Sequence, residues 1–210
     1  MNIIIFGASG GTGTELLTQA LNVGHRVTAF CRRPELITQQ HPGLSTFQGD
    51  ALNQNQVELA LKEHDAVLCA LGMPNIRDKS QLRAKATENI ISGMQRQGLK
   101  RLVCLSAFAA GDSYATMPFL YRRLIVPLMM KPLYIDHNRQ EAAIRQSQLN
   151  WTVVRPAILT NGERTGRYQH GSILRAKAST LKISRADVAD FMLKQLNDPG
   201  YLHASPSISY

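Results

Sequence analysis

The sequence is poor in cysteine, and what little it has does not form a metal site. Its 210 residues include only Cys31, Cys69 and Cys104, whose spacing matches no zinc or iron–sulfur motif. Two of the three fall within apolar runs that are typical of buried strands. We therefore expect core thiols, no disulfide, no bound metal, and a reducing, cytoplasmic compartment.

Long uncharged apolar runs are also missing. The most apolar long stretch, residues 118–134, contains two arginines, a lysine and two internal prolines, which argues against a membrane span. A strand is predicted directly after Met1, so we expect no signal peptide.

Aromatic residues make up 6% of the chain, although the formal net charge is +9. Residues 1–100 hold ten Lys and Arg against eight Asp and Glu, and residues 101–210 hold fourteen against seven. The basic residues are dispersed and no aromatic-rich basic stripe accompanies them, so we do not expect nucleic-acid binding. The charge is interpreted either as a solvated basic surface or as a field that attracts an anionic cofactor and substrate.

A glycine-rich turn stands near the start of the chain. The apolar run from Ile3 to Phe6 predicts a buried parallel strand, and residues 15–21 have helical spacing. Between them, Gly7 allows a sharp turn, Gly10 lets the backbone approach a phosphate, and Gly13 allows the helix to pack closely. Strand, glycine turn and helix in this order predict a dinucleotide-binding site, with the pyrophosphate at the helix N-terminus.

Two arginines follow the second predicted strand, residues 25–31. NAD-preferring enzymes carry an acidic residue near this point, which binds the ribose 2′-hydroxyl. Here Arg32 and Arg33 take its place. A guanidinium fork suits a 2′-phosphate, so this position favours NADPH over NADH. The alternative is a pair of solvated surface charges.

The rest of the chain alternates between strand-like and helix-like segments. This alternation predicts one domain, residues 1–210, with an α/β fold: a doubly wound, Rossmann-like parallel sheet with helices on both faces. We expect Asp136 to cap one helix, and the segment from Ser184 to Asp187 to form a capping box for the last. The further strands are expected at residues 45–50, 65–72, 101–108, 150–156 and 201–210 (the last closing the sheet edge), and the helices at 53–63, 81–97, 136–148 and 188–197.

Three polar or glycine positions fall where ligands bind in such sheets, beyond the carboxyl ends of the strands. Ser106 is either a functional hydroxyl or a turn hydroxyl. Asp50 either accepts from the adenine amino group or caps the next helix. Gly72 ends its strand and should face the cofactor.

Residues 109–135 and 157–183 are expected to form loops on the substrate side. Tyr121, Arg122 and Arg123 in the first loop suit a flat conjugated substrate that carries negative groups. The alternative is an insertion that packs on the core or on another subunit.

The chain resembles an atypical short-chain dehydrogenase/reductase. The motifs that carry this resemblance are the glycine turn, Arg32-Arg33, Gly49-Asp50, Ser106-Ala107-Phe108, Arg155-Pro156 and the segment 183–193. Within that group the chain most resembles the NADPH-dependent flavin reductase/biliverdin-IXβ reductase family over essentially its whole length. The resemblance implies NADP(H) as cofactor. It also implies which residues contact each part of the cofactor. The pyrophosphate would be bound by Gly7, Ser9, Gly10, Thr12, Gly13 and Thr14, and the 2′-phosphate by Arg32 with Arg33. Asp50 would lie by adenine, Leu71 and Gly72 on the ribose side, and Ser106 beside nicotinamide and substrate.

The sequence departs from that pattern at the proton donor. The Tyr-x-x-x-Lys pair of ordinary short-chain reductases is missing, since Ile125 follows Tyr121 and Asn138 follows Tyr134 at that spacing. His137 stands where the lysine would fall and matches a histidine of the resembled family. A second family histidine is replaced by Ile158, and the segment between Ser106 and His137 is about ten residues longer than expected.

We therefore expect an NADPH-dependent reductase of a flavin or a linear tetrapyrrole, with water as the proton source. Ser106 would bind substrate or order that water, and His137, with an ordinary pKa of about 6.5, would assist protonation unless it is merely an exposed helix residue. The alternatives are a non-catalytic NADP(H) sensor that resembles the NmrA-like regulators, and a quinone reductase or epimerase on the same fold. The oligomeric state is left open, and a monomer is compatible with the sequence.

Overall fold

The computed structural model of the chain describes residues 1–73, 79–108, 110–111, 123, 128, 130–172, 174 and 181–210. The strands are β1 (Asn2–Phe6), β2 (Arg26–Cys31), β3 (Leu44–Gln48), β4 (Ala66–Cys69), β5 (Arg101–Leu105), β6 (Asn150–Pro156), β7 (Ile158–Thr160), β8 (Gln169–Gly171), β9 (Lys182–Ser184) and β10 (Ser207–Ser209). The α-helices are α1 (Gly11–Asn22), α2 (Gln54–Ala60), α3 (Leu82–Gln97), α4 (Lys131–Gln146) and α5 (Arg185–Lys194), and short 3₁₀ helices form at Pro34–Leu36 and Pro199–Tyr201.

The main sheet has eight strands in the order β3-β2-β1-β4-β5-β6-β10-β8. Every neighbouring pair is parallel except β10 and β8. The strand order reverses between β1 and β4, which places a ligand crevice at their carboxyl ends. The predicted Rossmann-like α/β fold is confirmed.

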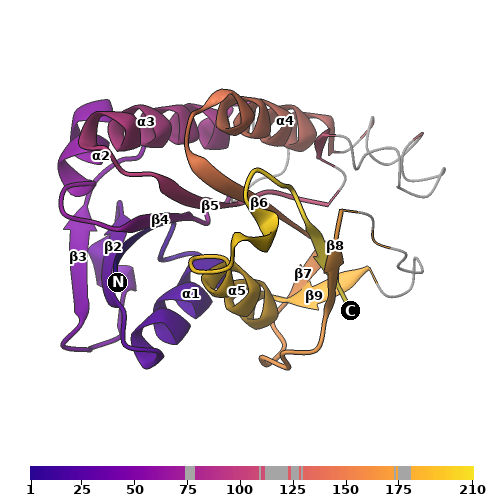
Figure 1. Cartoon of the computed structure of the whole chain (residues 1–210), viewed down its shortest axis with the longest axis horizontal. Helices are drawn as coiled ribbons and strands as arrows, with labels where there is room; N and C mark the ends of the chain where they lie inside the picture. Colours follow the sequence, from indigo (N-terminus) through magenta and orange to yellow (C-terminus); the bar gives the residue numbers. More distant parts are fainter. Residues whose placement is uncertain are drawn as a thin grey trace.

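Helices cover both faces of this sheet: α2, α3 and α4 lie on one side, and α1 and α5 on the other (Figure 1). The alternation of side chains along β1 explains this arrangement. Ile3 and Ile5 join the core beneath α1 and α5, whereas Ile4 and Phe6 join the core beneath α2 and α3. All three cysteines are buried and free, as the sequence predicted.

The start of the fourth long helix was predicted wrongly. α4 begins at Lys131 and not at Asp136, because Pro132 occupies its first turn, where a missing N–H costs nothing. Asp136 is buried within α4 and caps a different helix. Its carboxylate accepts from the backbone N–H groups of Arg83 (3.3 Å) and Ala84 (2.9 Å), at the N-terminus of α3.

The predicted loop 157–183 is partly regular. β7 pairs with β9 in a separate two-stranded sheet, and β8 pairs with β10. The C-terminal strand is consequently not the edge strand, since β8 lies outside it, and it is shorter than the predicted range 201–210.

The helix start at Ser184 is a cap, but only half of the expected capping box is present. Ser184 Oγ accepts from Asp187 N at 3.0 Å. The carboxylate of Asp187 instead accepts from the backbone of Thr165 and Gly166, both at 2.8 Å, and from the hydroxyl of Tyr210 at 2.7 Å. It thereby fastens the segment before β8 and the last residue to α5.

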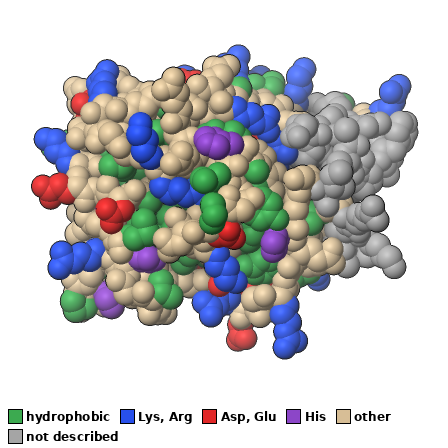
Figure 2. Space-filling view, viewed as in Figure 1, with side chains coloured by type: hydrophobic (Ala, Val, Ile, Leu, Met, Phe, Trp, Pro, Cys, Tyr) green, Lys and Arg blue, Asp and Glu red, His purple; other side chains and the backbone are tan. Residues whose placement is uncertain are grey.

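Lys and Arg side chains are spread over the face in Figure 2 and do not gather in one stripe there. No helix in the described ranges is long and apolar enough to cross a bilayer. Those ranges also hold no group of three or more His, Cys, Asp and Glu side chains suited to a metal ion.

Candidate functional site

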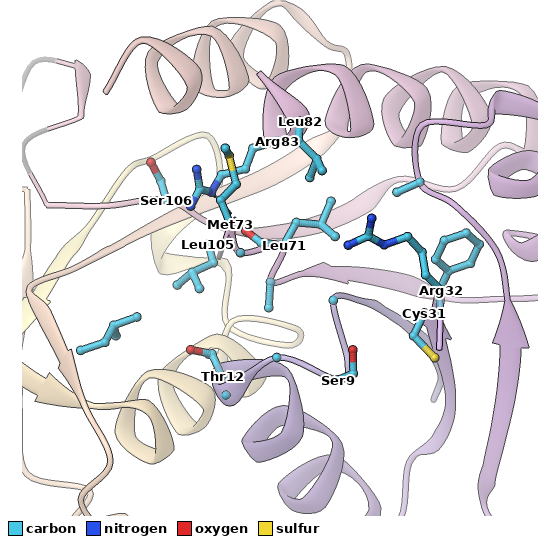
Figure 3. A pocket seen from close by; sticks show the side chains of 18 of the residues that line it. Ser9, Thr12, Cys31, Arg32, Leu71, Met73, Leu82, Arg83, Leu105 and Ser106 are labelled. Atoms are coloured by element: carbon cyan, nitrogen blue, oxygen red, sulfur yellow. Dashed lines mark hydrogen bonds between the residues drawn. The ribbon is translucent and has the colours of Figure 1, made fainter. Parts of the chain in front are cut away.

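A pocket of about 650 Å³ opens at the carboxyl ends of β1, β2, β4 and β5. It extends past Arg32, Ser9 and Thr12 to Leu71, Arg83 and Ser106 (Figure 3). Of the residues predicted to bind cofactor or to act in catalysis, those that line this pocket are Gly7, Ser9, Gly10, Thr12, Arg32, Arg33, Asp50, Leu71, Gly72, Ser106 and His137. The fold therefore brings residues from both halves of the sheet to one cavity.

The glycine turn has the geometry that its sequence predicts. Gly7 has a φ of +84°, and a Cβ there would lie 2.6 Å from the carbonyl oxygen of Ala70, which directly follows the neighbouring strand β4. A Cβ on Gly13 would lie 2.0 Å from Gly7 O, so Gly13 serves the close packing of α1 and does not itself line the pocket. Thr14 does not line the pocket either, since it lies outside on α1, where its hydroxyl donates to Gly10 O at 3.0 Å.

The N-terminus of α1 is suited to an anion. Its first helical hydrogen bond runs from Thr14 N to Gly10 O, so the three N–H groups before Thr14 have no acceptor within the helix. The first turn contains no acidic residue. Backbone donors and the helix dipole here match the requirements of a pyrophosphate.

A cation lies beside this helix start, which the sequence analysis missed. The side chain of Arg185 passes so close to Gly11 that a Cβ there would lie 2.7 Å from Arg185 Cδ. Arg185 lines the pocket and donates to the side chain of Asn161. Gly11 thus makes room for an arginine where the phosphates are expected, and only the tertiary approach of α5 to α1 reveals it.

Arg32 and Arg33 lie at the end of β2, both exposed and both in the pocket wall. Asp50 lines the same end, and its carboxylate accepts from Leu52 N at 2.9 Å. The alternative that Asp50 caps the next helix is wrong, because Asn53 is the N-cap of α2 and accepts from Gln56 N.

At the opposite end, Ser106 follows β5 and is buried. Its hydroxyl donates to Glu141 Oε1 at 2.7 Å, so it is more than a turn hydroxyl. Glu141 is 1% exposed and accepts from Arg155 Nε at 3.0 Å and Nη2 at 2.6 Å, and from Arg145 at 3.0 Å. Two guanidinium groups therefore fix the position of this carboxylate with charge-assisted hydrogen bonds.

His137 is also buried, and its ring orientation follows from its neighbour Gln140. Gln140 Nε2 donates to Thr87 Oγ1 (3.1 Å) and to Cys104 Sγ (3.3 Å), which leaves Gln140 Oε1 to accept from His137 Nδ1 at 3.2 Å. The proton of the neutral ring is thus assigned to Nδ1. Nε2 makes no hydrogen bond with the described residues and is an acceptor.

Burial, and then the positive charge of Arg83, lower the pKa of His137 to about 4. Both sequence-based expectations for this residue are wrong: it is not exposed, and its pKa is not ordinary. The imidazole is neutral at physiological pH, so it is a hydrogen-bond acceptor there and not a ready acid.

Arg83, which the sequence analysis also missed, lines the pocket from the first turn of α3. Its Nε donates to Leu71 O at 3.3 Å, and its Nη1 pairs with Asp136 Oδ2 at 3.2 Å. Burial lowers the pKa of this guanidinium, and the neighbouring Asp136 opposes that shift. The sequence held no signal for it, because the connection from β4 to α3 does not tell which side chain of the first turn faces the sheet.

The expected substrate residues are less well placed. Tyr121 and Arg122 lie outside the described residues, and Arg123 is exposed and does not line the pocket. The two expected substrate-side segments do contribute apolar wall residues, namely Leu133 from the first, and Ala157 and Leu159 from the second.

The model of a family described as NAD(P)H-binding matches residues 7–199. The chain belongs to this family. It is 29% identical over 211 residues to the uncharacterized protein YwnB of Bacillus subtilis, an alignment that covers 95% of this chain and 93% of YwnB. A Streptomyces griseus protein named (4-alkanoyl-5-oxo-2,5-dihydrofuran-3-yl)methyl phosphate reductase is 29% identical over 154 residues, which cover 73% of this chain and 46% of that protein.

Among solved structures, ChuY from Escherichia coli O157:H7, described as an anaerobillin reductase, has a TM-score of 0.81. The superposition covers 99% of this chain and 96% of ChuY at 22% identity. This likeness shows that the fold is shared. The resemblance is thus supported at the level of an NAD(P)H-binding family, and the cofactor of that family agrees with the geometry of the pocket.

Proposed function

We propose that this protein is an NADPH-dependent reductase that transfers hydride to a flavin or a linear tetrapyrrole. The observation that carries the proposal is the continuity of the pocket. A single cavity joins the anion-binding start of α1 to two arginines at one end and to the buried pair Ser106 and His137 at the other. This arrangement suits a dinucleotide held along its full length.

The residues fit the phosphates of NADPH. The free N–H groups of α1 and the guanidinium of Arg185 would bind the pyrophosphate, and Arg32 with Arg33 would bind the 2′-phosphate. Leu71 and Gly72 would lie on the ribose side, and Asp50 near adenine. When bound, the nicotinamide supplies the hydride, while the protein orients the acceptor and sets the electrostatics.

The end of the pocket at Ser106 and His137, here called the reacting end, lacks a strong acid among the described residues. The hydroxyl proton of Ser106 is directed to Glu141, and His137 is neutral at physiological pH. This arrangement favours acceptors, such as flavins, for which water can supply the proton. Ser106 would then bind the acceptor or order that water through its lone pairs.

Two relatives add support. The Streptomyces griseus protein is named as a reductase, and ChuY is described as an anaerobillin reductase. A sensor that binds NADP(H) without turnover is the second candidate, because the missing Tyr-x-x-x-Lys pair and the neutral His137 suit a site without acid catalysis.

The test is oxidation of NADPH, followed by the absorbance of the reduced nicotinamide, with riboflavin, FMN, biliverdin or a quinone as acceptor and with NADH in parallel. We expect turnover with a flavin or biliverdin and a preference for NADPH. Tight NADPH binding without oxidation by any acceptor would instead establish the sensor. Turnover restricted to the quinone would favour the quinone reductase.

A further inference from the structure

Arg83 has an unusual position for a cation. Its side chain is 8% exposed, yet it reaches the pocket. Two of its nitrogen atoms are engaged, Nε with Leu71 O and Nη1 with Asp136. Nη2 makes no hydrogen bond with any residue in the described ranges, so donors of a buried guanidinium remain available at the cavity.

The carboxylate that pairs with Arg83 has a second task. Asp136 also accepts from the backbone N–H groups of Arg83 and Ala84, so its carboxylate is shared between an ion pair and the cap of α3. A buried cation is costly unless it is paired and its donors are satisfied. An oxygen ligand at Nη2 would complete this requirement.

The other polar groups at this end are acceptors. Ser106 donates its proton to Glu141 and lies 3.4 Å from Nδ1 of His137, so its oxygen acts as an acceptor, and the free Nε2 of His137 is also an acceptor. Arg83 lies close enough for its charge to act on His137, and its guanidinium lies toward Ser106 in Figure 3. Arg83 lines the pocket, whereas Arg145 and Arg155, which bind Glu141, do not, so Arg83 is the described residue that brings a positively charged donor to this end of the cavity.

We propose that Arg83 binds the carbonyl oxygen of the hydride acceptor and stabilises the negative charge that develops on it. The inference rests on the proposed function, and it narrows the substrate to compounds with a carbonyl conjugated to the carbon or nitrogen that receives the hydride. Enones, lactams and the imide edge of a flavin belong to this class.

The electron balance is that of a conjugate reduction. The acceptor gains a hydride at the electrophilic atom, the electron pair of the adjacent double bond moves toward the carbonyl oxygen, and the nicotinamide is oxidised. Arg83 keeps its proton and holds the resulting oxyanion, which water then protonates, directly or at the conjugated position. Donors placed where negative charge develops act in the transition state more than in the ground state.

A simple Arg83 variant would leave Asp136 buried without its partner, so the experiment uses a matched background. Asp136→Asn removes the ion pair while an amide oxygen still caps α3. The double variant Arg83→Met with Asp136→Asn differs from it only in the guanidinium. Thermal unfolding first establishes that both proteins are folded.

The first readout is binding, without turnover. Riboflavin carries an imide edge and no phosphate, so its dissociation constant in the presence of NADP⁺ reports the carbonyl contact, and biliverdin serves as a second probe. We expect Arg83→Met in the Asp136→Asn background to weaken binding of the probe by roughly 10- to 100-fold, as for the loss of a hydrogen bond to a charged group. The dissociation constant of NADP⁺ alone should change by about twofold or less.

The second readout is spectroscopic. The imide N–H of riboflavin ionises in the alkaline range with a change in absorbance, and a cation at its carbonyl favours the anion. The bound flavin should therefore ionise at lower pH when Arg83 is present than in the double variant.

The assignment of Arg83 would be overturned if Asp136→Asn and the double variant bound the probe equally well. It would also be overturned if the double variant lost affinity for NADP⁺ and not for the probe. In both cases the proposed function stands. A wild-type protein that binds neither riboflavin nor biliverdin would overturn the proposed function, and the role of Arg83 with it.

Discussion

The hydroxyl of Ser106 donates to Glu141 at 2.7 Å, across 35 residues of sequence. This contact fixes which chemistry Ser106 can perform. A serine whose proton is committed to a carboxylate offers lone pairs, so it binds N–H groups or water and does not act as a proton donor. Glu141 in turn accepts hydrogen bonds from Arg155 and Arg145, which fix its position. Whether Ser106 acts as a hydrogen-bond acceptor or as a donor toward a ligand thus depends on one buried carboxylate, that of Glu141.

Replacing Glu141 with Gln should destabilise the protein strongly. The carboxylate is 1% exposed, and its partner Arg155 is equally buried, so the variant removes a negative charge that lies 2.6 Å from a buried guanidinium. Breaking a buried ion pair in this way costs about 3–5 kcal/mol, which chemical denaturation at pH 7 would measure.

The control removes both charges. Glu141→Gln with Arg155→Met removes the buried guanidinium together with its partner carboxylate and should recover a large part of the free energy of unfolding that the single variant loses. If the double variant is less stable than Glu141→Gln, the buried charge of Arg155 in the single variant does not account for the loss.

Replacing Ser106 with Ala should separate chemistry from cofactor binding. The variant removes a lone-pair donor at the reacting end, whereas Glu141 keeps its bonds to Arg155. We expect kcat/KM for the acceptor to fall by about tenfold or more, and the dissociation constant of NADPH to change by about twofold or less. Equal kcat/KM for variant and wild type would remove Ser106 from the site.

The neutral His137 makes stability depend on pH. The unfolded chain binds a proton on this histidine below about pH 6.5, but the folded protein binds it only below about pH 4. Between these values the unfolded state holds more protons, so the free energy of unfolding falls as the pH is lowered through this window, by roughly 3 kcal/mol in total. Above about pH 6.5 the ring is neutral in both states and contributes no slope.

Denaturation curves at pH 7 and pH 5 would measure this slope. His137→Asn keeps a donor near Gln140 but does not titrate, so its stability should fall less between the two pH values than that of the wild type. His41→Gln, at an exposed position, is the matched control and should keep the wild-type difference. If the free energy of unfolding of His137→Asn falls between pH 7 and pH 5 as much as that of the wild type, groups other than His137 cause the slope.

The residues at the expected cofactor end of the pocket could be brought together from the sequence because that end is local. Gly7, Gly10 and Gly13 lie within one turn between a strand and a helix, and Arg32 follows the strand that pairs with β1. Ser106 could be placed for a similar reason, since the carboxyl ends of parallel strands lie at one edge of the sheet.

The reacting end could not be predicted, because its contacts join distant segments. Arg83 meets Asp136 across 53 residues, and the sequence assigned Asp136 to the wrong helix end. The pKa of His137 depends on burial between α3, α4 and β5, which no local pattern encodes. Arg185 reaches the phosphate end only because Gly11 leaves room for it.

The proposed preference for NADPH is tested by reversing one charge at the end of β2. Arg32→Glu places a carboxylate where the 2′-phosphate is expected and where NAD-preferring enzymes carry an acid. We expect the dissociation constant of NADPH to rise by at least about tenfold, while that of NADH stays the same or falls, because the loss of a charge-assisted hydrogen bond and the added repulsion act on NADPH alone.

Arg26→Glu is the matched control, since Arg26 is exposed at the other end of the same strand. Both variants change the net charge of the protein equally, so a general electrostatic effect on an anionic cofactor would weaken NADPH binding in both. A 2′-phosphate contact at Arg32 requires that only Arg32→Glu discriminate between NADPH and NADH. Equal losses in the two variants would assign Arg32 to the solvated surface and leave the cofactor preference to another residue of the pocket.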